Sequence, residues 1–263
     1  MNTEGTPIYP QVKEVFVILL ITIIVTFVVA ALVALVGART ELFLLEGLVI
    51  IPALLYLVIK RYPIQTVFRL RRVSFNVLGI SAIIGMAFTI VTDEIDRLIQ
   101  LVLPMPEPIR QMLEASLKIN SISDLIIIAF SAVFLAAVVE EFLFRGFVQT
   151  SFENHFDVTK AVMSTALTFA FFHFNIWWSI QILIMGVILG VLAWKANSVY
   201  PAIVVHFINN AMALMSTNLT PTQMGWYYYK DHVRLPILIA AVLTTIYGIR
   251  LYYHFCDTRS STS

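Results

Sequence analysis

The chain has 263 residues, of which 59% are hydrophobic and 13% are charged. That charged fraction is about half of the value usual for soluble domains, and the mean hydropathy is +0.87. There are too few charges to cover a soluble surface. The net charge of +1 offers no basic footprint for nucleic acid, and the single cysteine, Cys256, excludes an internal disulfide. The composition therefore predicts an integral membrane protein.

Eight hydrophobic segments follow one another, each near the roughly 20 residues that cross a bilayer. They lie at residues 15–36, 42–59, 75–92, 125–139, 161–176, 177–194, 199–215 and 235–253. Because the runs are continuous and do not alternate every second residue, they predict α-helices and not a β-barrel. We expect an all-α, multi-pass bundle of about eight transmembrane helices, forming a single membrane-embedded domain over residues 1–263.

The distribution of Lys and Arg predicts the orientation of this bundle. With a cytoplasmic N-terminus, 11 of the 17 Lys and Arg residues lie on the cytoplasmic side, and the densest cluster lies between the second and third segments. The positive-inside rule then predicts that both termini are cytoplasmic. The short connections between segments favour a prokaryotic cell membrane.

One polar stretch, residues 93–120, separates the third and fourth segments. Pro108 suits the first turn of a helix, and Ile109, Met112 and Leu113 share one face of it. This pattern is typical of an interfacial amphipathic helix. It favours a membrane anchor, with a lid as the alternative.

Several polar side chains lie inside the predicted spans, where a charge at the helix centre costs roughly 2.5–3.5 kcal/mol. In the second half of the chain they are Glu140, Glu141, Arg145, His173, His206 and Asn210. At about 1.5 Å per residue, those of three different helices fall in one layer between the inner surface and the midplane. This coincidence predicts a common site, and simple helix-to-helix adhesion is the alternative. Glu46 is a further ionisable residue, isolated from the others in sequence.

Helical phase separates the roles of these residues. Glu141 and Arg145 are four residues apart, so we expect them to form a structural ion pair on one face. Glu140 points about 100° away from Glu141 and is left free for chemistry. His206 and Asn210 are also four residues apart and share a face.

A carboxylate and an imidazole on either side of a water form a general base. A second histidine and an asparagine can donate hydrogen bonds to a developing oxyanion. The set therefore predicts hydrolysis of an amide or ester within the membrane, in a pocket open to the cytoplasm. The motifs of serine hydrolases, zincins and nucleotide-driven pumps are absent.

A metal ion is the open question of this chemistry. Glu140, His173 and His206 would supply two histidines and a glutamate, a composition known for catalytic zinc. Spacing does not distinguish a zinc-bound water from a water activated by Glu and His alone. We favour a site that requires no cofactor, because Asn210 on the face of His206 has the character of a hydrogen-bond donor.

Three short motifs, each inside a hydrophobic segment, occur in a characteristic order. They are Glu140-Glu141-x-x-x-Arg145, Phe169-x-x-x-His173 and His206-x-x-x-Asn210. Together they resemble the motifs of the CPBP intramembrane proteases, also called the CAAX-protease and bacteriocin-processing or ABI family, whose eukaryotic branch includes the Ras-converting CAAX prenyl endopeptidase. The motif-bearing core covers about residues 121–216, and the accessory spans are 15–36, 42–59, 75–92 and 235–253.

The resemblance implies that Glu140 and His173 activate the water and that His206 and Asn210 form the oxyanion hole. It implies supporting roles for Glu141, Arg145 and Phe169. The partner would be a protein or peptide substrate, lipidated or plain, together with the lipid bilayer. The family does not determine the substrate. A non-enzymatic protein, either a proton-linked transporter or a bacteriocin-immunity scaffold, remains the rival interpretation.

Overall fold

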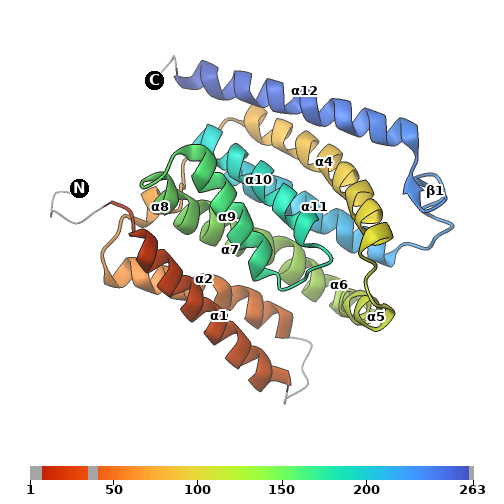
Figure 1. Cartoon of the computed structure of the whole chain (residues 1–263), viewed down its shortest axis with the longest axis horizontal. Coiled ribbons are helices and arrows are strands. Elements are labelled where there is room, and N and C mark those ends of the chain that lie inside the picture. The colour runs from red at the N-terminus through yellow and green to blue at the C-terminus, as the bar shows by residue number, and fades with distance from the viewer. Residues whose placement is uncertain (1–7, 35–40, 261–263) are drawn as a thin grey trace.

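The computed structural model describes residues 8–34 and 41–260 (Figure 1). Its elements are α1 (Val12–Ala34), α2 (Glu41–Ile59), α3 (Ile64–Val67), α4 (Phe75–Val102), α5 (Glu107–Ser116), α6 (Ile122–Ile128), the π-helix η1 (Ala129–Leu135), α7 (Ala136–Glu141), the π-helix η2 (Phe142–Val148), α8 (Gln149–Glu153), α9 (Val158–Phe172), α10 (Ser179–Ala196), α11 (Tyr200–Asn218), β1 (Tyr228–Tyr229), β2 (His232–Val233) and α12 (Leu235–Ser260). The predicted end of the first span at Val36, and both ends of the predicted domain, lie outside the described residues.

The chain is an all-α, multi-pass membrane bundle. Five helical stretches of the described residues are long and apolar enough to cross a membrane: Val12–Val33, Phe75–Val102, Ile122–Glu153, Ser179–Ala196 and Leu235–Asp257. Two shorter apolar helices, Leu45–Ile59 and Val158–Phe172, match the second and fifth predicted spans. The seventh predicted span forms α11. A helix therefore forms in each of the eight predicted segments, although eight membrane crossings stay a prediction.

The uninterrupted helical run Ile122–Glu153, from α6 to α8, occupies the middle of the bundle (Figure 1). It contacts α2 on one side and α11 on the other, while α4 packs between α11 and α12. Its buried face carries Leu143, Phe144 and Phe147, which belong to the main hydrophobic core. Large apolar side chains on the outer face of α1, such as Phe16 and Phe27, are more than half exposed. Such a surface suits lipid and not water.

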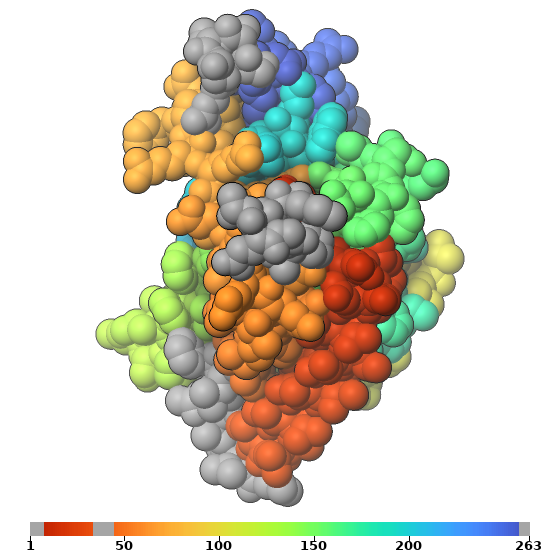
Figure 2. Space-filling view, turned by 90° about the vertical axis from the view of Figure 1, so that its left-hand side faces the viewer, coloured from red at the N-terminus to blue at the C-terminus, as the bar shows by residue number. Residues whose placement is uncertain are grey.

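The beginning of α1 and the end of α12 lie at the same end of the bundle (Figure 1). Figure 2 looks onto this end and shows the segment around α3 in orange, the end of α10 in cyan and the start of α9 in green. Backbone bonds join two of these parts, because the Val199 N–H donates to the Arg69 carbonyl at 3.1 Å. The basic segment between α2 and α4 is thus built into the structure of this end.

The helix α4 continues to Val102, past Thr92, where the sequence predicted the third span to end. That boundary was wrong because the charges at Asp93 and Arg97 were interpreted as a helix end. In the structure Arg97 Nε lies 3.3 Å from Asp93 Oδ1, one turn away. Charges paired four residues apart are compatible with a continuing helix.

A short antiparallel hairpin of β1 and β2, which the sequence did not predict, covers the far end of α4. Glu94 accepts a hydrogen bond from the Val233 N–H at 2.8 Å and lies 2.8 Å from His232 Nδ1. The Tyr228 hydroxyl donates to Asp93 at 2.9 Å. Desolvation, together with the nearby Asp93 carboxylate, raises the pKa of Tyr228 to about 12, so its phenol keeps the proton that it donates.

The predicted amphipathic helix is present as α5, with a proline in its first turn and no buried side chain. Beside it, the end of α4, the hairpin and the end of α11 enclose a cavity of about 570 Å³. Leu113 and Leu117 line this cavity together with Trp178. Whether α5 anchors the protein or covers this cavity as a lid stays a prediction.

Close packing holds α3 against the central helical run. A Cβ atom placed on Gly146 of η2 would lie 2.9 Å from the Phe68 Cα atom, closer than real Cβ contacts come. The rings of Phe68 and Phe142 stack beside this contact, with centroids 5.6 Å apart. Only glycine at position 146 therefore lets the central helical run approach Phe68 this closely.

We expect Gly146→Ala to destabilise the protein by about 1–3 kcal/mol, because the added methyl group overpacks against a backbone atom. The control is Gly79→Ala, whose Cβ would meet no atom within 4 Å and which should be neutral or stabilising through helix propensity. Thermal unfolding of both variants in the same detergent measures the difference. Equal melting temperatures for the two variants would contradict the packing argument.

Candidate active site

Two π-helical segments lie within the central helical run, and α7, which ends with Glu140 and Glu141, lies between them. A π-helix shifts the hydrogen-bond register to five residues and changes the direction of the side chains that follow. Short π-helical insertions are frequent at functional sites. The α-helical phases used for the sequence predictions therefore describe this region only approximately.

The predicted ion pair between Glu141 and Arg145 is present and is completely buried. Arg145 Nη1 lies 3.1 Å from Glu141 Oε1, and both side chains are 0% exposed. Arg145 Nη2 donates to the Gly186 carbonyl at 3.1 Å, and the guanidinium carbon lies 4.4 Å from the centre of the Phe169 ring. A carboxylate, a carbonyl and an aromatic face thus compensate part of the cost of burying the guanidinium, whose Nε atom has no hydrogen-bond partner among the described residues.

The same Glu141 carboxylate also holds His206, which the sequence prediction did not include. Glu141 Oε1 lies 2.8 Å from His206 Nδ1. Because a carboxylate accepts, the proton lies on Nδ1, and the ring is oriented with Nε2 toward Glu140. His206 Nε2 lies 3.9 Å from Glu140 Oε2. Glu140 and Glu141 therefore lie near opposite edges of one imidazole. The helical phase predicted their different directions but not this shared neighbour.

His173 lies directly after the last residue of α9, so the end of that helix positions it. Its Nδ1 donates to the Phe169 carbonyl at 2.8 Å. A carbonyl can only accept, so the neutral ring carries its proton on Nδ1 and leaves Nε2 as an acceptor. His173 Nε2 lies 3.8 Å from Glu140 Oε2.

The Phe169 side chain fills the space between these groups. It is 0% exposed, and its ring centre lies 4.7 Å from the ring of His173 and 5.8 Å from that of His206, both edge to face. Its ring faces Arg145 while its carbonyl holds His173. Phe169 therefore limits how the two imidazoles can turn.

Glu140 is the point at which the site converges. Its Oε2 atom is buried, has no hydrogen-bond partner within residues 8–34 and 41–260 and lies within 4 Å of Nε2 of both histidines. These separations are too long for direct hydrogen bonds and suit a bridging water. The side chains of Glu140 and His173 are 16% and 28% exposed, whereas that of His206 is 3% exposed. The free carboxylate oxygen thus faces the Nε2 atoms of both imidazoles, which are acceptors in the neutral rings.

Asn210 is bound to the central run in a way that the sequence did not predict. Its Nδ2 donates to the Ala132 carbonyl of η1 at 3.1 Å, and its Oδ1 accepts from Asn209 Nδ2 at 3.3 Å. One of its two amide hydrogens is therefore engaged by η1. Its place in an oxyanion hole stays a prediction.

The structure brings Glu46 to this site. It is half-buried on α2 and interacts electrostatically with Glu140, and α2 packs directly against α7. The sequence showed a carboxylate inside an apolar segment but could not place it, because residue 46 and residue 140 are far apart along the chain. Glu46 is therefore an additional acidic neighbour of the catalytic candidate.

Sequence analysis also missed the carbonyl groups that receive the buried polar side chains. Arg145 donates to Gly186, and one turn later Gln149 Nε2 donates to the Gly190 carbonyl at 2.9 Å. The two glycines also allow close packing, because Cβ atoms on them would meet α9 at 3.0–3.1 Å. A glycine pair in a sequence indicates close packing, and close packing also brings backbone carbonyls within reach of side chains on a neighbouring helix.

A metal ion held by Glu140, His173 and His206 is the alternative to a metal-free site. Within residues 8–34 and 41–260, no group of three or more His, Cys, Asp or Glu side chains is arranged to hold a metal ion. The three candidate zinc ligands meet pairwise, each imidazole at 3.8–3.9 Å from the carboxylate. Metal dependence therefore stays a question for experiment.

We expect Arg145→Leu to destabilise the protein by about 3–5 kcal/mol, because it leaves the Glu141 carboxylate buried without its cation. The control is Lys160→Ala, which removes an exposed pair with Asp157 at 3.0 Å and should cost less than about 1 kcal/mol. Unfolding of reconstituted protein with increasing denaturant measures both. Similar small losses of stability for the two variants would show that the buried pair contributes no more to the free energy of unfolding than the exposed pair.

Comparison with known proteins gives one match, over the part of the chain that carries this site. Residues 122–212 match the family model described as "Type II CAAX prenyl endopeptidase Rce1-like". No curated protein and no solved structure matches the chain. The matched segment runs from the start of α6 into α11 and includes all three motifs, and the family implies a protease, which is a hydrolase of peptide bonds. Residues 122–212 of this membrane-embedded chain are therefore similar to the Rce1-like CAAX prenyl endopeptidases.

Proposed function

We propose that the protein is an intramembrane endopeptidase in which Glu140 and His173 activate a water without a metal. The observation that carries the proposal is the unpartnered Glu140 Oε2 atom within 4 Å of Nε2 of both His173 and His206. One small molecule at hydrogen-bond distance from all three atoms fits these separations. A water there has a carboxylate as base, and the scissile carbonyl can approach from the exposed side of Glu140.

In the proposed reaction Glu140 removes a proton from the water, and the His173 Nε2 atom accepts a hydrogen bond from the same water and orients it. The hydroxide oxygen bonds to the scissile carbonyl carbon, and the carbonyl electron pair moves onto oxygen. When the carbon–nitrogen bond breaks, the proton held by Glu140 passes to the leaving amine. The products are a carboxylic acid and an amine, and the carboxylate is regenerated.

Stabilisation of the oxyanion is proposed for His206 and Asn210. Because Glu141 holds the Nδ1–H of His206, Nε2 can donate only when the ring is an imidazolium. Asn210 retains one amide hydrogen besides the one given to Ala132. Two donors aimed at a developing negative charge are the usual basis of such catalysis.

The substrate is proposed to be a protein or peptide, lipidated or plain, cleaved in a pocket that opens to the cytoplasm. Support for this orientation comes from the Lys and Arg bias and from the common end at which α1 begins and α12 ends (Figure 1). Both termini are then cytoplasmic, in a prokaryotic cell membrane. The catalytic core of about residues 121–216 is proposed to act with its accessory spans as one domain.

The rival, a transporter or immunity scaffold, has less support. Transporters commonly place substrate sites at broken helices, and α10 runs unbroken from Ser179 to Ala196. Its two glycines pack against α9 and accept hydrogen bonds from the central run. These observations favour a packing role over a hinge.

We expect Glu140→Gln and His173→Ala each to lower cleavage at least about 100-fold, since each removes a group that activates the water. His155→Ala, an exposed histidine at the end of the same helical run, is the control and should cleave normally. Purified protein is incubated with a panel of prenylated and plain peptides, and the products are identified by mass spectrometry. Normal turnover by folded Glu140→Gln would end the proposal.

We expect a chelator to leave cleavage unchanged, because the proposed base and oxyanion donors are side chains. The test is cleavage after dialysis against chelator, combined with elemental analysis of the active protein. A stoichiometric metal, with activity lost on chelation and restored by zinc, would instead assign Glu140, His173 and His206 as ligands.

A further inference from the structure

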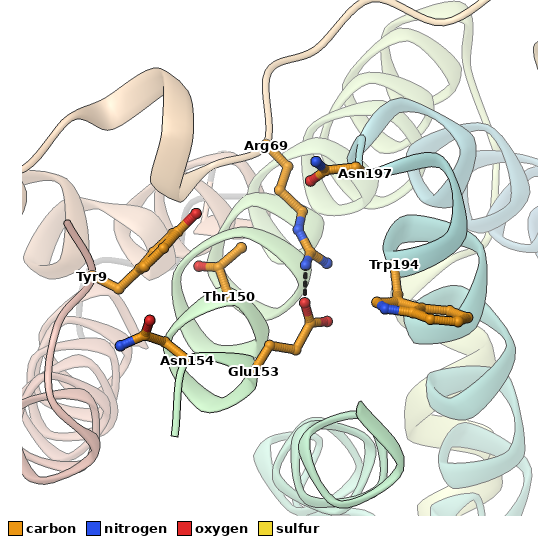
Figure 3. Close-up of a pocket in the computed structure, with 7 residues that line it drawn as sticks. All are labelled: Tyr9, Arg69, Thr150, Glu153, Asn154, Trp194 and Asn197. Atoms are coloured by element: carbon orange, nitrogen blue, oxygen red, sulfur yellow. Dashed lines mark hydrogen bonds and ion pairs between the residues drawn. The ribbon is translucent and has the colours of Figure 1, made fainter. Parts of the chain in front are cut away.

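A second polar cavity, of about 350 Å³, lies at the end of the bundle where α1 begins (Figure 3). Arg69, Glu153 and Asn197 line it, together with Tyr9 and Asn154. The lining comes from the chain before α1, the segment after α3, the end of α8 and the turn after α10. Four separate segments of the described chain therefore contribute polar side chains to one hollow.

The Arg69 guanidinium is the unusual feature of this cavity. Arg69 is 6% exposed, and its Nη2 group pairs with Glu153 (Figure 3). Its Nη1 group is buried and has no hydrogen-bond partner among the residues that the structure describes. A buried donor left unpaired costs free energy, and more so when it carries charge. A ligand with an acceptor oxygen would remove this cost.

The backbone prevents Arg69 from relieving this cost by moving away. Its φ angle is 52°, in the left-handed region, and its carbonyl accepts from the N–H groups of Val199 and Arg71 at 3.1 and 2.8 Å. A non-glycine residue persists in this conformation only when its surroundings impose it. The backbone of Arg69 is therefore held in place, and the pair with Glu153 orients its guanidinium.

The charges around the cavity favour an anion. Glu153 is already engaged, because it pairs with Arg69 and accepts from Gln149 Nε2 at 2.8 Å. Exposed Lys60 and Arg61 lie on the same connecting segment, and such charges raise the local concentration of anions.

This cavity is separate from the cleavage site. Glu153 and Glu140 are 13 residues apart on one helical run, which corresponds to roughly 20 Å. Neither the unpaired Glu140 oxygen nor either catalytic histidine lines the cavity. An inference about the cavity thus does not depend on the proposed peptidase activity.

We propose that this cavity binds an anionic phosphate group, held by the Arg69 guanidinium and assisted by the amides of Asn154 and Asn197. The planar guanidinium matches two oxygens of a phosphate. Two sources share this chemistry: the headgroup of an anionic phospholipid, and free phosphate from the surrounding solution.

The test uses full-length protein purified in detergent and two probes, phosphatidylglycerol and inorganic phosphate, with bound molecules counted by native mass spectrometry. Uncharged diacylglycerol controls for binding by acyl chains alone. We expect Arg69→Gln to weaken binding of the preferred probe about tenfold and Arg71→Gln, an exposed cation outside the cavity, to leave it within about twofold. Preference for phosphatidylglycerol assigns the lipid as the source, and preference for inorganic phosphate assigns the free anion.

A second variant, Glu153→Gln, tests the proposal even if Arg69→Gln does not fold. It releases the guanidinium from its carboxylate while keeping an acceptor for Gln149, so we expect tighter binding of the same probe. Equal losses for Arg69→Gln and Arg71→Gln would indicate diffuse surface charge and overturn the proposal. Unchanged or weaker binding by folded Glu153→Gln would overturn it as well.

Discussion

The buried carboxylate of Glu141 is the group on which the arrangement of the site depends. It neutralises Arg145 at 3.1 Å and holds His206 at 2.8 Å, and the side chains of Glu141 and Arg145 are both fully buried. Inside a membrane protein a charge of either sign needs such a partner. Because one carboxylate serves both groups, the cost of burying the arginine and the orientation of the histidine are coupled. This coupling leaves Glu140, the adjacent residue, without a partner of its own.

Close helix packing makes this polar interior possible. The glycines of α10 bring its backbone against α9 and leave carbonyls that accept from Arg145 and Gln149. Two donors one turn apart on the central run thus meet two acceptors one turn apart on α10. Larger residues at these positions would push the helices apart and leave both side chains unsatisfied. The two glycines therefore allow these hydrogen bonds to form, in addition to allowing close helix packing.

Charged side chains have different partners at the two ends of the bundle. At one end, Asp93 and Glu94 are covered by the β1–β2 hairpin and become part of a continued helix. At the other end, the buried Arg69 side chain lines a polar cavity, and its Nη1 group has no hydrogen-bond partner among the described residues. The site around Glu140 lies between these ends, within the long central run. Its partial exposure is consistent with access for water and for an extended substrate.

The sequence by itself determined the helical, membrane-embedded class of the protein and the approximate positions of its helices, because hydropathy and spacing within one helix are local properties. It also named the candidate site residues, whose roles stay a prediction. The Glu141–Arg145 pair was predictable for the same reason. Only the tertiary structure decided that Glu141 also holds His206, that Asn210 is bound to Ala132 and that Glu46 approaches Glu140. These contacts join helices far apart in the chain, and two π-helical segments rotate the side chains away from α-helical phase. The end of α4 was missed because the partners of its charges come from a hairpin more than a hundred residues later.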